Sequence, residues 1–270
     1  MLQKVIIIAR HGPREPSIDI STLPKFERNK KTSMITSKGK KYCQQFGSNI
    51  KNKTDGLVIT NNDIYIASSY VQRTIDSSKE FMIGFDEELK YEVNIDNRLF
   101  GATSLDQRQK LYINTCKTIS INDQQLNKQI YDVFRYKIQK SNDYFDLYTA
   151  LNCYQFEGLY QPDELFNKIV SKAKMFYNKL FSNIELLKLF TDDVLELIIS
   201  IVNDKTIKFA YLSTHDVVIF PLALRLIHTF TSYRQYVELP DFCSYVMYKI
   251  YDNKTDLYYN DKLIVSFNKN

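Results

Sequence analysis

The stretch Val5-Ile6-Ile7-Ile8-Ala9-Arg10-His11-Gly12-Pro13-Arg14-Glu15-Pro16 decides the fold of this 270-residue chain. Its first part is an unbroken apolar run, which is typical of a strand buried on both faces of a parallel sheet. Its second part places a histidine between two arginines where the chain leaves that strand. Open α/β sheets bind their ligands beyond the carboxyl ends of the strands. The stretch therefore predicts an α/β protein with a ligand site at this edge of the sheet.

The two arginines favour an anion as that ligand. A guanidinium group stays charged, and its planar fork matches the oxygens of a phosphate. The positive charge on both sides of His11 disfavours protonation of its ring. A neutral imidazole beside a bound phosphate can attack phosphorus as a nucleophile. A histidine that merely fills the core is the alternative interpretation, but arginines rarely flank a core position on both sides.

The run Arg-His-Gly-x-Arg-x-Pro resembles the signature of the histidine phosphatase superfamily, in the branch of the acid phosphatases and phytases. Three further stretches follow in the family's order. They are Ile35-Thr36-Ser37-Lys38-Gly39, with Thr36 or Ser37 capping a helix through residue 51; residues 64–69 with Gln72-Arg73-Thr74 and a helix to about residue 85; and a strand ending in His215-Asp216. The C-terminal residues 240–267 resemble the family's closing strands, and the middle of the chain matches only loosely.

The resemblance implies a fold, a reaction and a set of site residues. The fold is a three-layer α/β sandwich with a mostly parallel central sheet, as in phosphoglycerate mutases, and a helical cap inserted into it. The reaction is hydrolysis of a phosphomonoester through a phosphohistidine on His11, without a metal or a cofactor. Asp216 would be the general acid, so best activity is expected at acidic pH. The phosphate would be bound by Arg10, Arg14, Arg73 and His215.

Several of these residues also have a structural interpretation. Arg73 stands at a helix start, where a cation is unfavourable unless an anion lies nearby, and a surface salt bridge is the alternative. Asp216 could cap a helix over residues 217–227, which is compatible with acid catalysis. Glu15 could compete as the acid but suits a solvated surface. His228 at the end of that helix is interpreted as structural.

Hydrophobic periodicity predicts the remaining elements. Central parallel strands are expected at residues 5–9, 64–68 and 207–212, and antiparallel or edge strands at 243–251 and 263–267, joined through Asp252-Asn253-Lys254. Helices are expected at residues 126–138, 162–181 and 184–202. We assign residues 97–185 to the helical cap, and residues 1–96 and 186–270 to the catalytic core.

Composition is consistent with a globular enzyme that acts on a small anionic substrate. The net charge is +5 and 44% of the residues are hydrophobic. Four scattered cysteines (43, 116, 153 and 243) and three histidines lack metal-ligand spacing, and no phosphate-loop or dinucleotide fingerprint is present. Because the first strand begins at Lys4, we expect no signal sequence, a cytoplasmic location and reduced thiols. No apolar run is long enough to span a membrane. The sequence indicates no oligomeric state.

The substrate is the least determined feature. The loop over residues 17–34 carries Lys25, Arg28, Lys30 and Lys31, which could bind a polyphosphorylated substrate such as an inositol phosphate or form a solvated surface. Pro13 removes a backbone donor, and Ser69-Tyr70 replaces the family's more usual Thr-Asp. A catalytically idle phosphate- or inositol-phosphate-binding protein of the same fold remains the alternative. A nucleic-acid binder using the lysines at 30–31, 38–41 and 51–53 is disfavoured, because acidic residues intersperse them.

Overall fold

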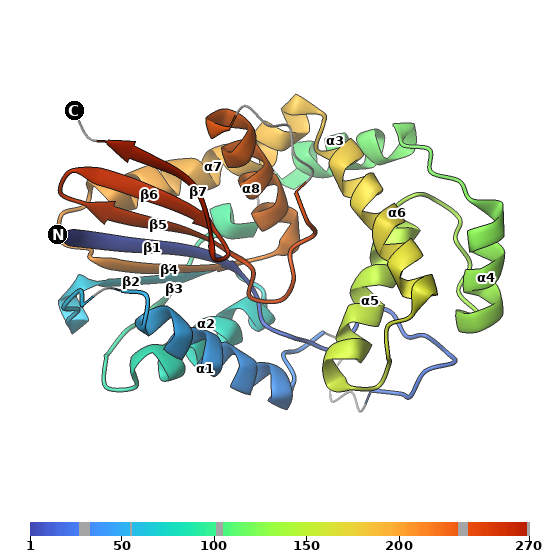
Figure 1. Cartoon of the computed structure of the whole chain (residues 1–270), viewed down its shortest axis with the longest axis horizontal. Coiled ribbons are helices and arrows are strands. Elements are labelled where there is room, and N and C mark those ends of the chain that lie inside the picture. Colours follow the sequence, from blue (N-terminus) through green and yellow to red (C-terminus); the bar gives the residue numbers. More distant parts are fainter. Residues whose placement is uncertain (27–32, 55, 101–104, 232–236, 269–270) are drawn as a thin grey trace.

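The computed structural model describes residues 1–26, 33–54, 56–100, 105–231 and 237–268. Within these residues the chain forms a seven-stranded sheet with the order β3-β2-β4-β1-β5-β6-β7 (Figure 1). The first four of these strands are parallel, and the last three are antiparallel to their neighbours. The strands are β1 (Leu2–Arg10), β2 (Ile64–Ser68), β3 (Val93–Ile95), β4 (Phe209–Thr214), β5 (Tyr245–Tyr251), β6 (Lys254–Tyr259) and β7 (Lys262–Asn268).

Helices cover both faces of the sheet. Helices α1 (Ser37–Lys51) and α2 (Gln72–Asp86) lie on one face, and α7 (Ile184–Asn203) and α8 (Asp216–Phe230) lie on the other (Figure 1). Strand β1 shows how the layers are held together: Val5 and Ile7 pack into the core under α1 and α2, whereas Ile6 and Ile8 pack into the core on the other face. All four side chains are fully buried, which explains the continuous apolar run.

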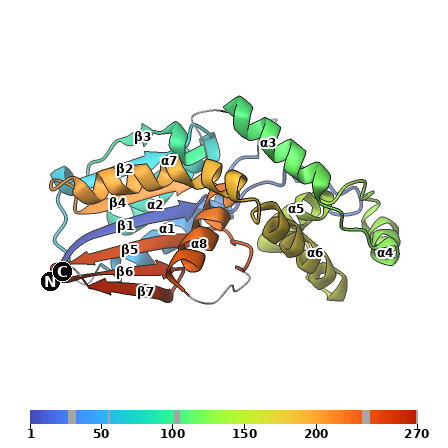
Figure 2. The same ribbon diagram turned by 90° about the horizontal axis from the view of Figure 1, so that it is seen from above.

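Four helices lie beyond the carboxyl ends of the parallel strands (Figures 1 and 2). They are α3 (Leu105–Thr118), α4 (Gln124–Phe134), α5 (Asp143–Glu157) and α6 (Glu164–Leu180). The ring of Phe145 on α5 stacks on that of Tyr177 on α6 with centroids 3.8 Å apart, and Tyr177 also contacts Phe220 of α8. The helical insertion therefore shares one hydrophobic core with the α8 side of the sheet.

The register of the parallel strands brings three chain segments together at one edge. Arg10 at the end of β1 pairs with Thr214 at the end of β4, and Ser68 at the end of β2 pairs with Ser213. The hydrogen bond from the His11 amide to the Thr214 carbonyl extends this ladder by one step, at 2.8 Å. The residues that follow the three strands must therefore be close neighbours.

The predicted α/β sandwich with a helical insertion is confirmed, with several differences in detail. Helices α3 and α5 and strands β3 and β6 were not predicted. Strand β6 begins at Lys254, the last residue of the predicted link, and lies between the two closing strands. Strand β4 lies two residues later than expected, so it runs directly into His215. The predicted loop residues Arg28, Lys30 and Lys31 lie outside the described residues.

Two element boundaries differ for a visible backbone reason. The strand expected from residue 243 begins at Tyr245, because Cys243 has a φ of 59°, a left-handed conformation that a strand does not accommodate. The helix expected through residue 138 ends at Phe134, because Arg135 takes the left-handed conformation that terminates a helix. Helix α8 begins at Asp216 itself, with His215 as its N-cap residue.

Candidate functional site

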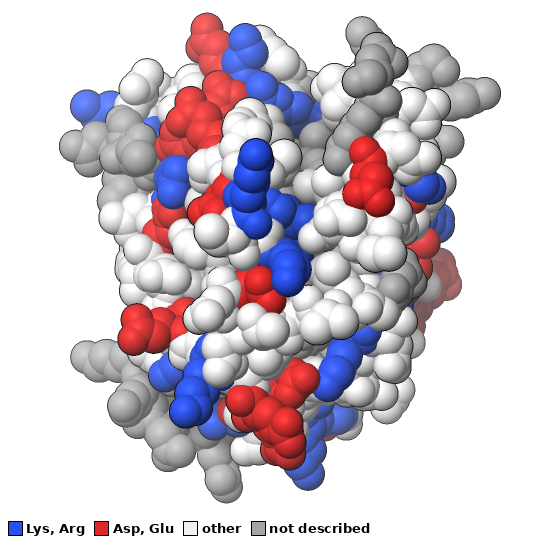
Figure 3. All heavy atoms as spheres, turned by 90° about the vertical axis from the view of Figure 1, so that its left-hand side faces the viewer, with Lys and Arg blue, Asp and Glu red and all other residues white. Residues whose placement is uncertain are grey.

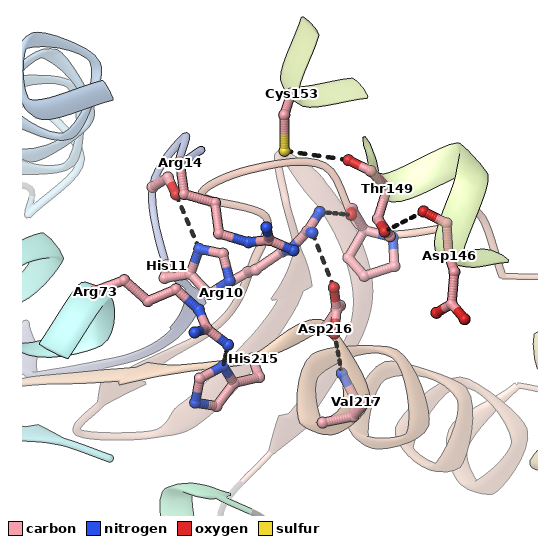
Figure 4. A network of polar contacts seen from close by, with 12 residues as sticks. Arg10, His11, Arg14, Arg73, Asp146, Thr149, Cys153, His215, Asp216 and Val217 are labelled. Atoms are coloured by element: carbon pink, nitrogen blue, oxygen red, sulfur yellow. Dashed lines mark hydrogen bonds and ion pairs between the residues drawn. The ribbon is translucent and has the colours of Figure 1, made fainter. Parts of the chain in front are cut away.

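The six predicted site residues gather at the carboxyl edge of the sheet, although they come from three separate parts of the chain (Figure 4). Arg10 is the last residue of β1, and His11 and Arg14 follow it. Arg73 lies in the first turn of α2. His215 and Asp216 connect β4 to α8. Except for Asp216 and Arg73, which are partly exposed, these side chains are buried.

His11 is held as a neutral ring with one nitrogen available. Its Nδ1 lies 2.8 Å from the Gly12 carbonyl oxygen, and because a carbonyl only accepts, Nδ1 must donate and carry the proton. Burial and the positive charges of Arg73 and Arg10 hold the pKa of His11 well below its ordinary value. The Nε2 lone pair is then the free, nucleophilic end of the ring.

Three guanidinium groups at the site have unused hydrogen-bonding capacity. The Nε atoms of Arg10, Arg14 and Arg73 are buried and have no hydrogen-bond partner among the described residues. Burial and the charge of Arg14 lower the pKa of Arg73 to about 10, which indicates that the cations repel one another. Buried donors without partners are rare in folded proteins, and an anion is the ligand that would satisfy all three.

The backbone amides of His11 and Gly12 are already occupied. The Gly12 amide donates to Ser77 Oγ at 2.9 Å, and Ser77 Oγ in turn donates to the Arg73 carbonyl at 2.6 Å. The His11 amide is bonded to Thr214, and Pro13 has no N–H to offer. Neither of these amides is available to an anion and Pro13 has none, so an anion at this edge would draw on the unpaired guanidinium groups.

Asp216 points its carboxylate at the arginine cluster. Its Oδ2 lies 2.8 Å from Arg10 Nη2, and its Oδ1 accepts the Val217 amide at 2.8 Å. Burial raises the pKa of the Asp216 carboxyl, but the charges of Arg10 and Arg14 outweigh this effect and hold the pKa below its ordinary value. This carboxyl is therefore ionised.

His215 is oriented by two neighbours. Arg73 Nη2 donates to its Nδ1 at 3.2 Å, so its Nε2 carries the proton and donates to Ser69 Oγ at 2.9 Å. Burial and the Arg73 charge lower the pKa of His215 to about 3, which keeps this ring neutral as well. The ring centroids of His215 and His11 are 5.6 Å apart.

Sequence reasoning missed the residues that support this cluster. Ser69 and Ser77 fix His215 and Gly12, and Phe242 lies under Arg10, with its ring centroid 4.7 Å from the guanidinium carbon. Ser77 could have been found as the residue one helical turn after Arg73. The sequence carries no signal that places Phe242 here. Glu15, the rejected competitor for the acid, accepts the Met34 amide through Oε2 instead.

A cavity of about 560 Å³ opens beside the loop that follows Arg14. Its lining is of mixed charge and includes Lys25 and Lys40 together with Glu15, Asp76 and Glu157. The role of the loop lysines in binding a polyphosphorylated substrate stays a prediction. Within the described part of the chain, no group of three or more His, Cys, Asp or Glu side chains could hold a metal ion, and none of the helices there has both the length and the apolar character to cross a bilayer.

Comparison with known sequences finds no matching family model and no matching curated protein. Structures do match. The Hafnia alvei phytase in complex with tartrate has a TM-score of 0.69 at 13% identity, over 95% of this chain and 84% of that one. The Citrobacter braakii phytase has a TM-score of 0.67 at 12% identity, over 95% of this chain and 84% of that one. The Bifidobacterium longum multiple inositol polyphosphate phosphatase, in complex with inositol hexasulfate, has a TM-score of 0.62 at 13% identity, over 98% of this chain and 87% of that one. The chain has the fold of these phytases, so the predicted fold is confirmed.

Proposed function

We propose that this chain is a metal-independent phosphomonoesterase that works through a phosphohistidine on His11. Arg10, Arg14 and Arg73 would bind the phosphate. His215 would join them by exchanging the hydrogen bond from its Nε2 to Ser69 Oγ for one to a phosphate oxygen. The observation that carries the proposal is the set of three buried guanidinium groups with unpaired Nε atoms around one neutral imidazole. Their charge would stabilise the oxygens of the transferring phosphoryl group, which is most of what this reaction needs from a protein.

The first step would form a bond between His11 Nε2 and phosphorus while the ester P–O bond breaks. The hydrogen bond from Nδ1 to Gly12 holds the ring in the tautomer whose Nε2 lone pair is free. The leaving oxygen takes up the proton of Asp216 as it departs. In the second step a water attacks phosphorus, Asp216 takes a proton from that water, and the P–N bond breaks to release inorganic phosphate and neutral His11.

The low pKa of Asp216 is compatible with an acid role. Its pKa is low because arginine charges surround it. A bound phosphate dianion offsets those charges and competes for Arg10, and both effects raise the pKa of the carboxyl. Asp216 would therefore hold its proton in the substrate complex, most readily at acidic pH.

A direct experiment separates this function from an idle phosphate-binding protein. Release of phosphate from p-nitrophenyl phosphate would be measured with a chelator present, for wild type, His11→Ala and the matched control His228→Ala, which changes a histidine in the last turn of α8. We expect activity in wild type and the control, its loss in His11→Ala, and an acid-labile phosphoryl group trapped on the wild type. Equal rates in wild type and His11→Ala would refute the nucleophile. Phosphate binding without turnover would establish the idle alternative.

A small phosphorylated molecule fits this site better than a nucleic acid. Lysines of the basic runs pair with carboxylates, as Lys51 does with Asp86 at 2.8 Å and Lys40 with Glu80 at 3.6 Å. On the end of the molecule opposite the site, charges of both signs are interspersed (Figure 3). A basic surface able to follow a phosphate backbone would need one sign to dominate. The structural relatives named above are phytases and an inositol polyphosphate phosphatase, so inositol phosphates belong in the substrate panel.

A further inference from the structure

Two aromatic rings lead from His215, at the candidate site, to the surface. The short helix η2 (Asn97–Phe100) ends in Phe100, whose ring meets that of His215 edge-on, with centroids 5.1 Å apart and planes at 86°. The ring of Tyr70 packs against that of Phe100, with centroids 4.9 Å apart. The Tyr70 side chain is 49% exposed. A continuous aromatic surface therefore starts at His215 and reaches solvent.

Both rings are held in place by contacts around them. Arg108 of α3 lies over Phe100, with its guanidinium carbon 4.9 Å from the ring centroid, and its Nη1 donates to the Phe100 carbonyl. The other side of this guanidinium faces the ring of Phe190, also at 4.9 Å. Tyr70 directly follows Ser69, whose hydroxyl is bonded to His215. The aromatic surface is thus fixed before a substrate arrives, which reduces the entropy lost on binding.

The chemistry of this surface selects a kind of leaving group. Aromatic rings attract one another when their centroids are roughly 4.5–7 Å apart. Because Phe100 lies against His215, we expect a ring joined to the ester oxygen directly, or through one carbon, to meet the pair while its phosphate is bound. A second phosphate would gain little here, because the one guanidinium that the described residues place at these rings, that of Arg108, is buried between Phe100 and Phe190.

We propose that Tyr70 and Phe100 form a binding site for an aromatic leaving group, so that the preferred substrates are aryl and arylmethyl phosphate monoesters. The proposal rests on the proposed function and narrows its substrate class. It also gives a role to Tyr70, which occupies a position where the sequence departs from the family pattern. Tyr70 and Phe100 act in specificity and take no part in phosphoryl transfer.

The test compares two substrates that differ only in the ring. Benzyl phosphate and cyclohexylmethyl phosphate are both primary alkyl esters of similar size, so the chemical step demands nearly the same of each. One aromatic contact of ordinary strength corresponds to a preference of roughly three- to tenfold. We expect wild type to favour benzyl phosphate in kcat/KM by about this factor. Tyr70→Ala should bring the ratio close to one, with the larger loss in kcat/KM for benzyl phosphate, whereas Tyr70→Phe should keep the preference.

A matched control and a binding readout make each outcome decisive. Tyr131→Ala removes a tyrosine of similar exposure, 48%, from α4 and should leave the ratio unchanged. Phe100→Leu keeps the packing around His215 and should reduce the preference. Binding of benzylphosphonate and cyclohexylmethylphosphonate, measured by calorimetry, reports the same ratio without turnover. A wild-type ratio near one, or a ratio unaltered by Tyr70→Ala, overturns this inference. Absence of turnover with a persisting binding ratio would refute the hydrolase function and leave the aromatic site standing.

Discussion

Replacement of Asp216 by asparagine should slow the enzyme in proportion to how poor the leaving group is. Asparagine has nearly the same shape as aspartate, but its amide holds no proton that it can transfer. General acid catalysis contributes about 10²–10⁴-fold to rate, which corresponds to roughly 2.7–5.4 kcal/mol of activation free energy. An alkyl phosphate should lose this whole factor, because an alkoxide leaves poorly without a proton. p-Nitrophenyl phosphate should lose much less, because nitrophenolate is a stable anion.

The assay is kcat/KM for wild type and Asp216→Asn with p-nitrophenyl, phenyl and glycerol phosphates. The logarithm of the loss should increase along this series as the leaving group becomes more basic. The variant should also bind inorganic phosphate more tightly, because one negative charge has been removed from beside the arginine cluster. A lower inhibition constant for phosphate, together with the graded loss of rate, would separate an acid role from a general disturbance of the pocket.

A stability measurement controls for folding. Oδ1 of Asp216 accepts the Val217 amide and Oδ2 pairs with Arg10, so an asparagine amide leaves one of these donors without an acceptor. An unsatisfied buried donor costs about 1–3 kcal/mol, which urea unfolding would detect. Partial unfolding reduces the rates of all three substrates by one common factor. A loss that is the same for the three esters, with a folded variant, would refute the assignment of Asp216 as the acid.

Three further predictions follow from the structure. The free energy of unfolding should fall as the pH drops below about 6.5, because His11 and His215 are neutral when folded and become protonated on unfolding. The fall should approach about 1.4 kcal/mol per pH unit for each histidine. Urea titrations at several pH values should show that His215→Asn roughly halves this pH dependence. A slope that His215→Asn does not change would contradict the buried, neutral state of that ring. Gly12→Ala should abolish p-nitrophenyl phosphate turnover, because its Cβ would lie 2.2 Å from Cys43 Sγ, and adding Cys43→Ala should restore part of it; no rescue would mean that the contact is not the cause. Lys4→Met should cost about 1–3 kcal/mol of stability and leave kcat unchanged. The reason is that Lys4 Nζ donates to the Ile201, Val202 and Asp204 carbonyls at the end of α7, away from the site. An unchanged melting temperature would argue against a stabilising role of these hydrogen bonds.

Sequence reasoning located the candidate site because each of its parts is tied to a strong local pattern. Arg10 and His11 follow an apolar strand, and His215 and Asp216 follow another, so the rule that parallel strands end at one edge was enough to bring them together. Arg73 was found because Gln72-Arg73-Thr74 resembles the family's helix start, and a cation in the first turn of a helix, which is unfavourable without an anion, supported that interpretation. The geometry places these residues together, whereas their catalytic roles stay predictions for the experiments above.

The elements that were missed carry weak or misleading patterns. Helix α5 buries residues around most of its circumference, among them Tyr144, Leu147, Ala150 and Cys153, so it shows no single apolar stripe. Helix α3 has the opposite problem, because it is mostly polar. Strand β6 begins directly after a two-residue turn. Its own first residues include Lys254 and Asp256, which are typical of a loop. Contacts such as that between Phe100 and His215 join segments far apart in sequence, and no local sequence pattern indicates them.

The arginine cluster that would bind phosphate also explains how Asp216 could become protonated when a substrate binds. Arg10, Arg14 and Arg73 hold like charges close together, and the ionised carboxylate of Asp216 offsets them. A phosphate dianion brings acceptors to the unpaired Nε atoms and takes over this role. The carboxylate is then no longer needed as a counter-charge, and the repulsion between it and the phosphate favours its protonation. The proton that the leaving group requires is therefore expected on Asp216 only when a phosphate is bound, as a consequence of electrostatics and without any movement of the backbone.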